Sequence, residues 1–213
     1  RADAGSVLGI DLSRPMLARA RRRAKAAGLG NVQFVAGDAQ IHPFDPGSYD
    51  VVISRMAMMF MADPSAAFAN LARALRSGGR LAVMVWQAPA ANEWTQAIVG
   101  AVTAELPAGQ PPAPGAPGPF ALADPVRAGA LLEAAGFTDL ATTPVAGPLW
   151  FGSDVDDALE FLTGFGAPKY ALDQLDPSAA DRLRDRLRAV LGDHVTASGV
   201  SLEAAAWIYS AQR

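Results

Sequence analysis

The sequence predicts an α/β domain with a mostly parallel sheet, helices on both faces and an antiparallel last strand. Short apolar runs alternate with segments of helical length along the N-terminal half of the 213-residue chain, which is the pattern of β-α-β units. These runs are apolar at nearly every position, as strands buried on both faces of a parallel sheet are. Such sheets bind ligands in the crevice at the carboxyl ends of their strands. We therefore look for functional residues where the predicted strands end.

The composition is that of an ordinary globular chain, with 51% hydrophobic residues, 18% charged residues and a net charge of -3. The small negative charge argues against a nucleic-acid-binding protein, whose surface carries a dominant positive field. The chain has no cysteine, which excludes disulfides and thiolate metal sites and fits a cytoplasmic location. No apolar run approaches the roughly 18 residues of a membrane span. We expect a cytoplasmic protein with no membrane span, no nucleic-acid partner and no metal site; its oligomeric state stays open.

Two acidic residues follow the first two predicted strands. Val7–Asp11 and Val32–Val35 form these strands, and the helix between them begins after Ser13 and stops at Gly28, a typical N-cap and a typical terminating glycine. The second strand runs into the turn Gly37-Asp38-Ala39. Because the carboxyl ends of parallel strands meet at one edge of a sheet, we expect Asp11 and Asp38 to lie near each other.

The remaining segments continue the alternation, apart from a loop and a helical insertion. A Pro-, Gly- and Ala-rich stretch over Leu106–Phe120 predicts an exposed loop. Residues 153–195 predict a helical cap inside a single domain that spans residues 1–213. The other predicted elements are strands at Val51–Ser54, Leu81–Trp86, Phe137–Val145 and Leu202–Ala211, and helices from Asp63 to Gly78-Gly79, from Asp124 to Gly136, over Asp154–Phe165 and over Ser178–Leu191.

Taken in order, several motifs resemble the class I S-adenosylmethionine-dependent methyltransferase family, in particular its ubiquinone/menaquinone-type small-molecule superfamily. The resemblance covers nearly the whole chain, and no single motif decides it. It implies a Rossmann-like, doubly wound sheet and S-adenosylmethionine as the cofactor. The motifs are Gly9-Ile10-Asp11, Ser13-x-x-Met16, Gly37-Asp38-Ala39, Phe44…Tyr49-Asp50-Val51-Val52, Leu75-Arg76-x-Gly78-Gly79-Arg80-Leu81 and Gly118-Pro119-Phe120…Asp124-Pro125.

The resemblance also implies roles for residues at the strand ends. Asp11 would bind the ribose hydroxyls, Met16 would pack on the adenine, and Asp38 would contact the adenine amino group. A carboxylate can accept two such hydrogen bonds at once. The alternative is that both acids only cap turns or helices and bind no ligand. This alternative is stronger for Asp38 than for Asp11, because Gly-Asp turns are common. The implied cofactor-binding residues are Asp11, Leu12, Met16, Asp38, Ala39, Gln40, Ser54, Arg55 and Met56.

One part of the family pattern is missing from the sequence. The family's first strand and its glycine-rich turn should precede Val7, and no G-x-G-x-x-G occurs; Gly28-Leu29-Gly30 lacks the third glycine. In the family that strand lies between the second and the fourth, so its absence would expose two apolar strand edges. Together with the start at Arg1, this predicts a C-terminal fragment that binds the cofactor poorly by itself; a decayed copy is the alternative.

The activity implied by the resemblance is methyl transfer to a small acceptor. The apolar residues Trp150, Phe151, Phe161, Leu162 and Phe165 suggest that the acceptor is partly hydrophobic. No catalytic residue is assigned, because surface positions are expected for both histidines, His42 and His194. Two other functions stay open. An NAD(P)-dependent oxidoreductase also binds ribose with a strand-end acid, and a non-catalytic remnant would serve as a partner domain.

Overall fold

The computed structural model describes residues 5–106, 115–164 and 166–213. The chain begins with a β-α-β unit, which we call the N-terminal unit. Strands β1 (Val7–Asp11) and β2 (Val32–Ala36) pair in parallel, and helix α1 (Arg14–Ala26) connects them. The Ser13 hydroxyl accepts the N–H of Met16 at 3.3 Å, as an N-cap residue does. The elements predicted for this segment are confirmed.

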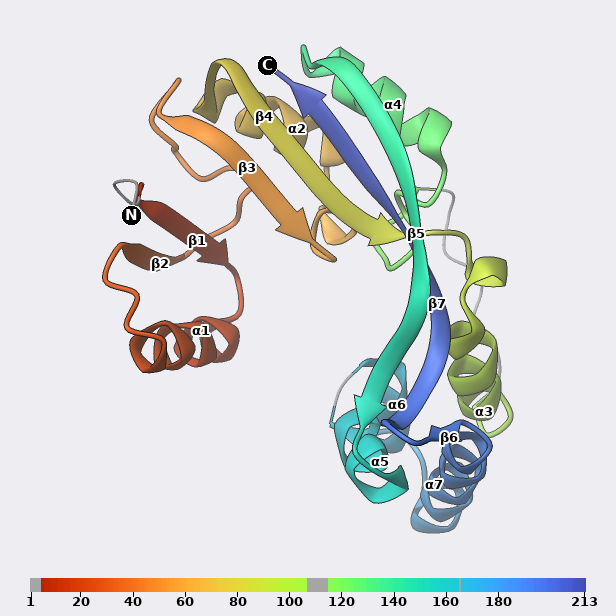
Figure 1. The fold of residues 1–213 in the computed structure, drawn as a ribbon. Coiled ribbons are helices and arrows are strands. Elements are labelled where there is room, and N and C mark those ends of the chain that lie inside the picture. Colours follow the sequence, from red (N-terminus) through yellow and green to blue (C-terminus); the bar gives the residue numbers. More distant parts are fainter. Residues whose placement is uncertain (1–4, 107–114, 165) are drawn as a thin grey trace.

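The main sheet has the strand order β3-β4-β7-β5, and the short β6 pairs with β7. The pair β3–β4 is parallel, whereas β7 is antiparallel to β4, β5 and β6. The predicted α/β class with an antiparallel last strand is therefore confirmed (Figure 1). The strands are β3 (Tyr49–Arg55), β4 (Leu75–Trp86), β5 (Thr138–Gly152), β6 (Val195–Thr196) and β7 (Gly199–Gln212).

Two helices, α2 (Pro64–Ala74) and α4 (Pro125–Ala134), cover one face of the main sheet (Figure 1). Asp63 and Asp124 cap them, with prolines at the first positions, as the sequence predicts. Their inner faces meet the sheet in a main core. This core includes the fully buried Phe68, Leu81, Val83, Leu132 and Tyr209.

A second core holds the cap, which contains α5 (Val155–Thr163), α6 (Gly166–Leu172) and α7 (Pro177–Gly192). The π-helical turn η3 (Thr95–Val99) and α3 (Gly100–Thr103) also pack into it. The predicted helical cap is therefore present, and a segment that leaves β4 completes it. The long strands β5 and β7 connect the two cores (Figure 1). Two short 3-10 turns, η1 (Met58–Phe60) and η2 (Pro89–Ala91), complete the elements of the described residues.

Several predicted boundaries are wrong. Helix α2 ends at Ala74 and β4 begins at Leu75, well before the predicted Gly78-Gly79 stop, because Leu75 already pairs with Tyr49. Strand β5 runs on to Gly152, since it stays paired with β7 along its length. Of the predicted loop, residues 107–114 lie outside the described residues, and residues 115–120 form turns.

The N-terminal unit and the main sheet are not joined into one sheet. Among the described residues, β1 pairs only with β2 and β3 pairs only with β4, although β1 and β3 run in the same direction (Figure 1). Val51 and Ile53 of β3 are 54% and 80% exposed, while Val52 between them packs on the main core. Within the described chain, no strand lies between β1 and β3.

None of the described helices has both the length and the apolar character that crossing a membrane requires.

Candidate functional site

The two strand-end acids lie together, as the sequence predicts. Asp11 ends β1, and its backbone carbonyl accepts the N–H of Gly37, just after β2, at 3.1 Å. Asp11 Oδ1 accepts the N–H of Ser13 at 2.7 Å, and Asp38 Oδ1 accepts the N–H of Gln40 at 2.9 Å. Both acids are half-buried. Each turn thus orients a carboxylate whose second oxygen has no hydrogen-bond partner within the described residues.

Helix α2 holds the turn that carries Asp38. The side-chain amide of Asn70 donates to the carbonyls of Ala39 and His42, at 2.9 Å each. The Gln40 side chain accepts the N–H of Asp63 at 2.8 Å, so it fastens the turn to the start of α2. The N–H of Ala39 has no acceptor in the described part of the chain. The turn therefore presents a fixed free donor next to a fixed carboxylate.

Two apolar side chains stand open to solvent beside Asp11. Leu12 is 72% exposed and Met16 is 58% exposed, although both are large and apolar. Leu17, the next residue of α1, is buried, so the helix has its own inner face and Met16 does not belong to it. An apolar surface next to orienting polar groups is what ligand sites commonly offer.

Ser54, Arg55 and Met56 form a separate group at the end of β3. Ser54 and Arg55 pair with Val83 and Met84, and the N–H of Met56 donates to the Met84 carbonyl at 2.8 Å. Met56 has a φ of 55°, a left-handed conformation that is unusual for a long side chain and is often found at functional sites. Arg55 is exposed and forms no ion pair with the described residues. The unpaired edges of β1 and β3 separate this group from the two acids.

An aromatic cluster at the end of β4 was not predicted from the sequence. The ring centroids of Trp86 and Trp94 are 5.3 Å apart, and those of Trp94 and Phe120 are 6.1 Å apart. All three rings are half-buried. The Trp94 indole donates to Oδ1 of the fully buried Asn92 at 3.0 Å, which fixes the ring. These three aromatic residues do not share a predicted helix or strand whose period would group them, so the sequence did not indicate that they lie together.

The aromatic residues predicted to line the acceptor site have mixed positions. Phe151 is 7% exposed and packs in the cap core, so its role there is structural. Trp150 is 55% exposed and donates to the Ser198 carbonyl at 3.0 Å. Phe161 is 52% exposed and contacts the Phe151 ring, while Phe165 lies outside the described residues. Over the described ranges, no three His, Cys, Asp or Glu side chains are grouped to hold a metal ion.

Comparison with known proteins finds sequence similarity over the N-terminal part. The methyltransferase domain family matches residues 1–83. A demethylmenaquinone methyltransferase of Thermus thermophilus is 42% identical over 89 residues, which are 42% of this chain and 40% of that protein. A nocamycin O-methyltransferase of Saccharothrix syringae is 34% identical over 145 residues, 61% of this chain and 51% of that protein. The chain thus spans about half of these relatives, or less.

Structural similarity extends over nearly the whole chain. The crystal structure of the YcgJ protein from Bacillus subtilis superposes with a TM-score of 0.59 and 17% identity, covering 98% of this chain and 82% of that one. At this identity the match shows a shared fold. Residues 1–83 therefore match the methyltransferase domain family, and the chain as a whole shares a Rossmann-like α/β fold with the YcgJ protein.

Proposed function

We propose that the protein transfers a methyl group from S-adenosylmethionine to a small, partly hydrophobic acceptor. The observation that carries this proposal is the pair of half-buried carboxylates at the ends of two neighbouring parallel strands. The N–H of Gly37, the neighbour of Asp38, donates to the Asp11 backbone carbonyl, and each carboxylate has one oxygen without a hydrogen-bond partner among the described residues. A ligand with vicinal hydroxyls and an amino group, such as adenosine, offers the donors that these oxygens need.

The residues present fit the nucleoside half of the cofactor. Asp11 suits the ribose hydroxyls, Asp38 suits the adenine amino group, and the free N–H of Ala39 suits a ring nitrogen. The exposed side chains of Leu12 and Met16 offer apolar surface for the faces of the base. Gln40 contributes by holding the turn, because its side-chain oxygen already accepts the Asp63 N–H.

The chemistry requires little of the protein beyond placement. S-adenosylmethionine supplies a methyl group that its sulfonium charge already activates. Asp11 and Asp38 would orient the nucleoside, and the walls of the site would exclude water and align the acceptor. A general base is needed only where the acceptor must lose a proton, and we assign none.

We further propose that a strand from another part of the same protein lies between β1 and β3. The support is geometric: the two strands run in the same direction, their near edges are unpaired, and Val51 and Ile53 are open to solvent (Figure 1). A parallel strand there would join both sheets. Its carboxyl end would lie between Asp11 and Ser54–Met56, and would bring the two separate groups of the site together.

The acceptor is proposed to be a small organic molecule with an apolar portion. The two relatives are named as demethylmenaquinone and nocamycin methyltransferases, which supports a small molecule. The half-buried cluster of Trp86, Trp94 and Phe120 follows β4 and supports an apolar contact surface near the ligand edge of the sheet. A cytoplasmic location and the absence of a nucleic-acid partner remain predictions.

Binding of isotope-labelled S-adenosylmethionine tests the role of the two acids. The protein is prepared with the residues encoded directly upstream in its gene, and Asp11→Asn is compared with Asp173→Asn, a surface acid of the cap that pairs with Lys169. We expect Asp11→Asn to weaken binding at least about tenfold, because charge-assisted hydrogen bonds are lost. Asp38→Asn should have a smaller effect, and Asp173→Asn none. Equal binding by Asp11→Asn and the unchanged protein would refute the assignment; binding of NAD(H) instead would favour an oxidoreductase.

A further inference from the structure

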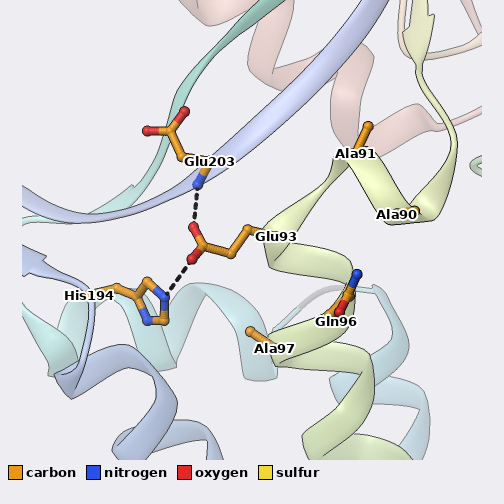
Figure 2. Close-up of a pocket in the computed structure, with 7 residues that line it drawn as sticks. All are labelled: Ala90, Ala91, Glu93, Gln96, Ala97, His194 and Glu203. Atoms are coloured by element: carbon orange, nitrogen blue, oxygen red, sulfur yellow. Dashed lines mark hydrogen bonds and ion pairs between the residues drawn. The ribbon is translucent and has the colours of Figure 1, made fainter.

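A polar cluster away from the strand-end acids surrounds His194, just after α7 (Figure 2). His194 Nδ1 lies 2.7 Å from the Val190 carbonyl oxygen, and Nε2 lies 3.2 Å from Oε1 of Glu93. The His194 side chain is 23% exposed, so the position is more enclosed than the surface site expected from the sequence. Glu93 comes from the segment between η2 and η3, far from His194 in the chain.

Both ring nitrogens of His194 face hydrogen-bond acceptors. A neutral imidazole has one N–H and can donate to only one of them, whereas the imidazolium can donate to both. Two acidic groups act on the ring, Glu93 and the adjacent Asp193, and Glu203 of β7 lines the same hollow. The Val190 carbonyl raises the pKa of His194 above its ordinary value, and Glu93 adds to this effect.

Glu93 also replaces a missing strand partner of β7. Strand β4 ends at Trp86, opposite Ala206, and β6 pairs with Gly199 and Val200, so within the described chain the residues of β7 between Val200 and Ala206 have no partner strand on that side. Asn92 Oδ1 accepts the N–H of Ala205 at 2.9 Å, and Glu93 Oε2 accepts the N–H of Glu203 at 2.8 Å. The Glu203 N–H lowers the pKa of the Glu93 carboxyl. One carboxylate therefore connects β7 to the end of α7.

We propose that Glu93 and His194 form a proton-dependent latch that fastens the end of α7 to β7 and to the segment leaving β4. The same segment carries Trp94, so the latch sets how firmly the cap is held against the aromatic cluster at the ligand edge. A hollow of about 440 Å³ borders both side chains, so water can reach the latch and exchange protons with it (Figure 2). The latch does not depend on methyl transfer.

The latch is complete only where Glu93 is ionised and His194 is protonated. The pKa of Glu93 is lowered from 4.5, so its contribution is present above that value and is lost as the pH falls through its folded pKa. The pKa of His194 is raised from 6.5, so its contribution is present below that value and is lost as the pH rises through its folded pKa. The latch should therefore hold α7 most firmly at pH values between 4.5 and 6.5.

Nuclear magnetic resonance on the full chain tests the latch. The His194 ring resonances are titrated in the unchanged protein and in Glu93→Gln, with His42, the other histidine, as the internal control. Protection of the Glu203 amide from hydrogen exchange is followed in parallel, and the Ala205 amide serves as control because Asn92 does not titrate. We expect Glu203 protection, corrected for the intrinsic exchange rate, to fall roughly two- to tenfold as His194 loses its proton.

The Glu93→Gln variant separates the latch from simple packing. The glutamine oxygen can still accept the Glu203 N–H, and its amide can donate to a neutral His194, so the fold should be retained and Glu203 protection should no longer fall as His194 loses its proton. We expect the titration midpoint of His194 to fall in this variant while that of His42 stays unchanged. An unchanged His194 midpoint in Glu93→Gln, or Glu203 protection that stays flat while His194 titrates, would overturn the proposal.

Discussion

The N-terminal unit lies beside β3 at one edge of the main sheet, the cap lies at the far ends of β5 and β7, and the two are built in contrasting ways (Figure 1). In the cap, Leu183, Leu187 and Leu191 follow one face of α7 and are fully buried among residues from β5, β7 and α3. In the N-terminal unit, the described residues that are buried are Leu17 and Ala24 of α1. The unit that carries the candidate cofactor residues therefore has little core of its own.

The part of the chain whose sequence matches a known family is therefore not the part that packs most tightly. Residues 1–83 match the methyltransferase domain family, yet β1 touches the main core only through half-buried side chains such as Leu8 and Ile10. The cap has the denser core, although its sequence indicates only amphipathic helices. We attribute the open packing of the N-terminal unit to the unpaired edges between β1 and β3, which leave it attached on one side.

The largest expected effect on stability is in the cap. Leu187→Ala removes a fully buried side chain from the middle of the cap core, and such changes lower the free energy of unfolding by about 2–5 kcal/mol. Leu29→Ala, at a position that is 52% exposed near the N-terminal unit, should change it by less than about 0.5 kcal/mol. Urea denaturation followed by circular dichroism measures both. If the two variants lost similar amounts of unfolding free energy, the denser packing of the cap would not make it more important for stability than the N-terminal unit.

Hydrogen exchange should separate the two regions within one sample. Few buried contacts and unpaired edges allow local opening, so amides of β1 and β2 should exchange at least about 100-fold faster than amides in the C-terminal half of β7. From Ala206 onward, β7 lies between β4 and β5 and contains the fully buried Tyr209. Mass spectrometry of peptic peptides gives this ratio directly. Equal protection of the two regions would mean that the N-terminal unit is firmly docked.

A charge on the open face of β3 should be tolerated. Ile53 is 80% exposed, so Ile53→Glu should change the free energy of unfolding of this chain by no more than about 0.5 kcal/mol. It should also raise the soluble fraction, because charges protect unpaired apolar strands from association. Val83→Glu, the same change at a buried position on β4, should prevent folding. A large stability loss from Ile53→Glu would show that this face is already covered.

The smallest effect concerns an ion-pair cluster of the cap. Glu105 has a side chain that is 5% exposed and pairs with Arg182 and Arg186. The Arg186 hydrogen bond lowers the pKa of Glu105 from 4.5, so its contribution is present above that pH and is lost as the pH falls through the folded pKa. We expect Glu105→Gln to lower the melting temperature slightly at pH 7, with the difference closing in acid. A difference that persists at pH 3 would contradict the ionic explanation.

Much of the fold was predictable because each β-α-β segment carries local signals. Ser13, Asp63 and Asp124 cap the helices that they were expected to begin. The true extent of β4 and β5 was not predictable, since it depends on pairing with Tyr49 and with β7. The partner of Arg188 on α7 was not predictable either, since it is Asp156 of α5, whereas Arg184 pairs with Asp181 of its own helix.

The strand-end acids of the candidate site could be predicted from the sequence, but the residues that hold such groups in place could not. Asp11 and Asp38 could be placed because parallel strands bring their carboxyl ends to one edge. Asn70, which holds the Asp38 turn, and Glu93, which meets His194, act across the tertiary structure and left no local pattern. The positive φ of Met56 is likewise a property of the folded chain.

The most direct test compares S-adenosylhomocysteine binding by this chain and by a version carrying the residues encoded directly upstream. Isothermal titration calorimetry is performed on both, each with and without Asp11→Ala. We predict that only the extended version binds and that Asp11→Ala abolishes the binding. Equal binding by the two versions would contradict the proposed strand between β1 and β3. Binding by neither version would contradict the cofactor site itself and would favour a non-catalytic partner domain.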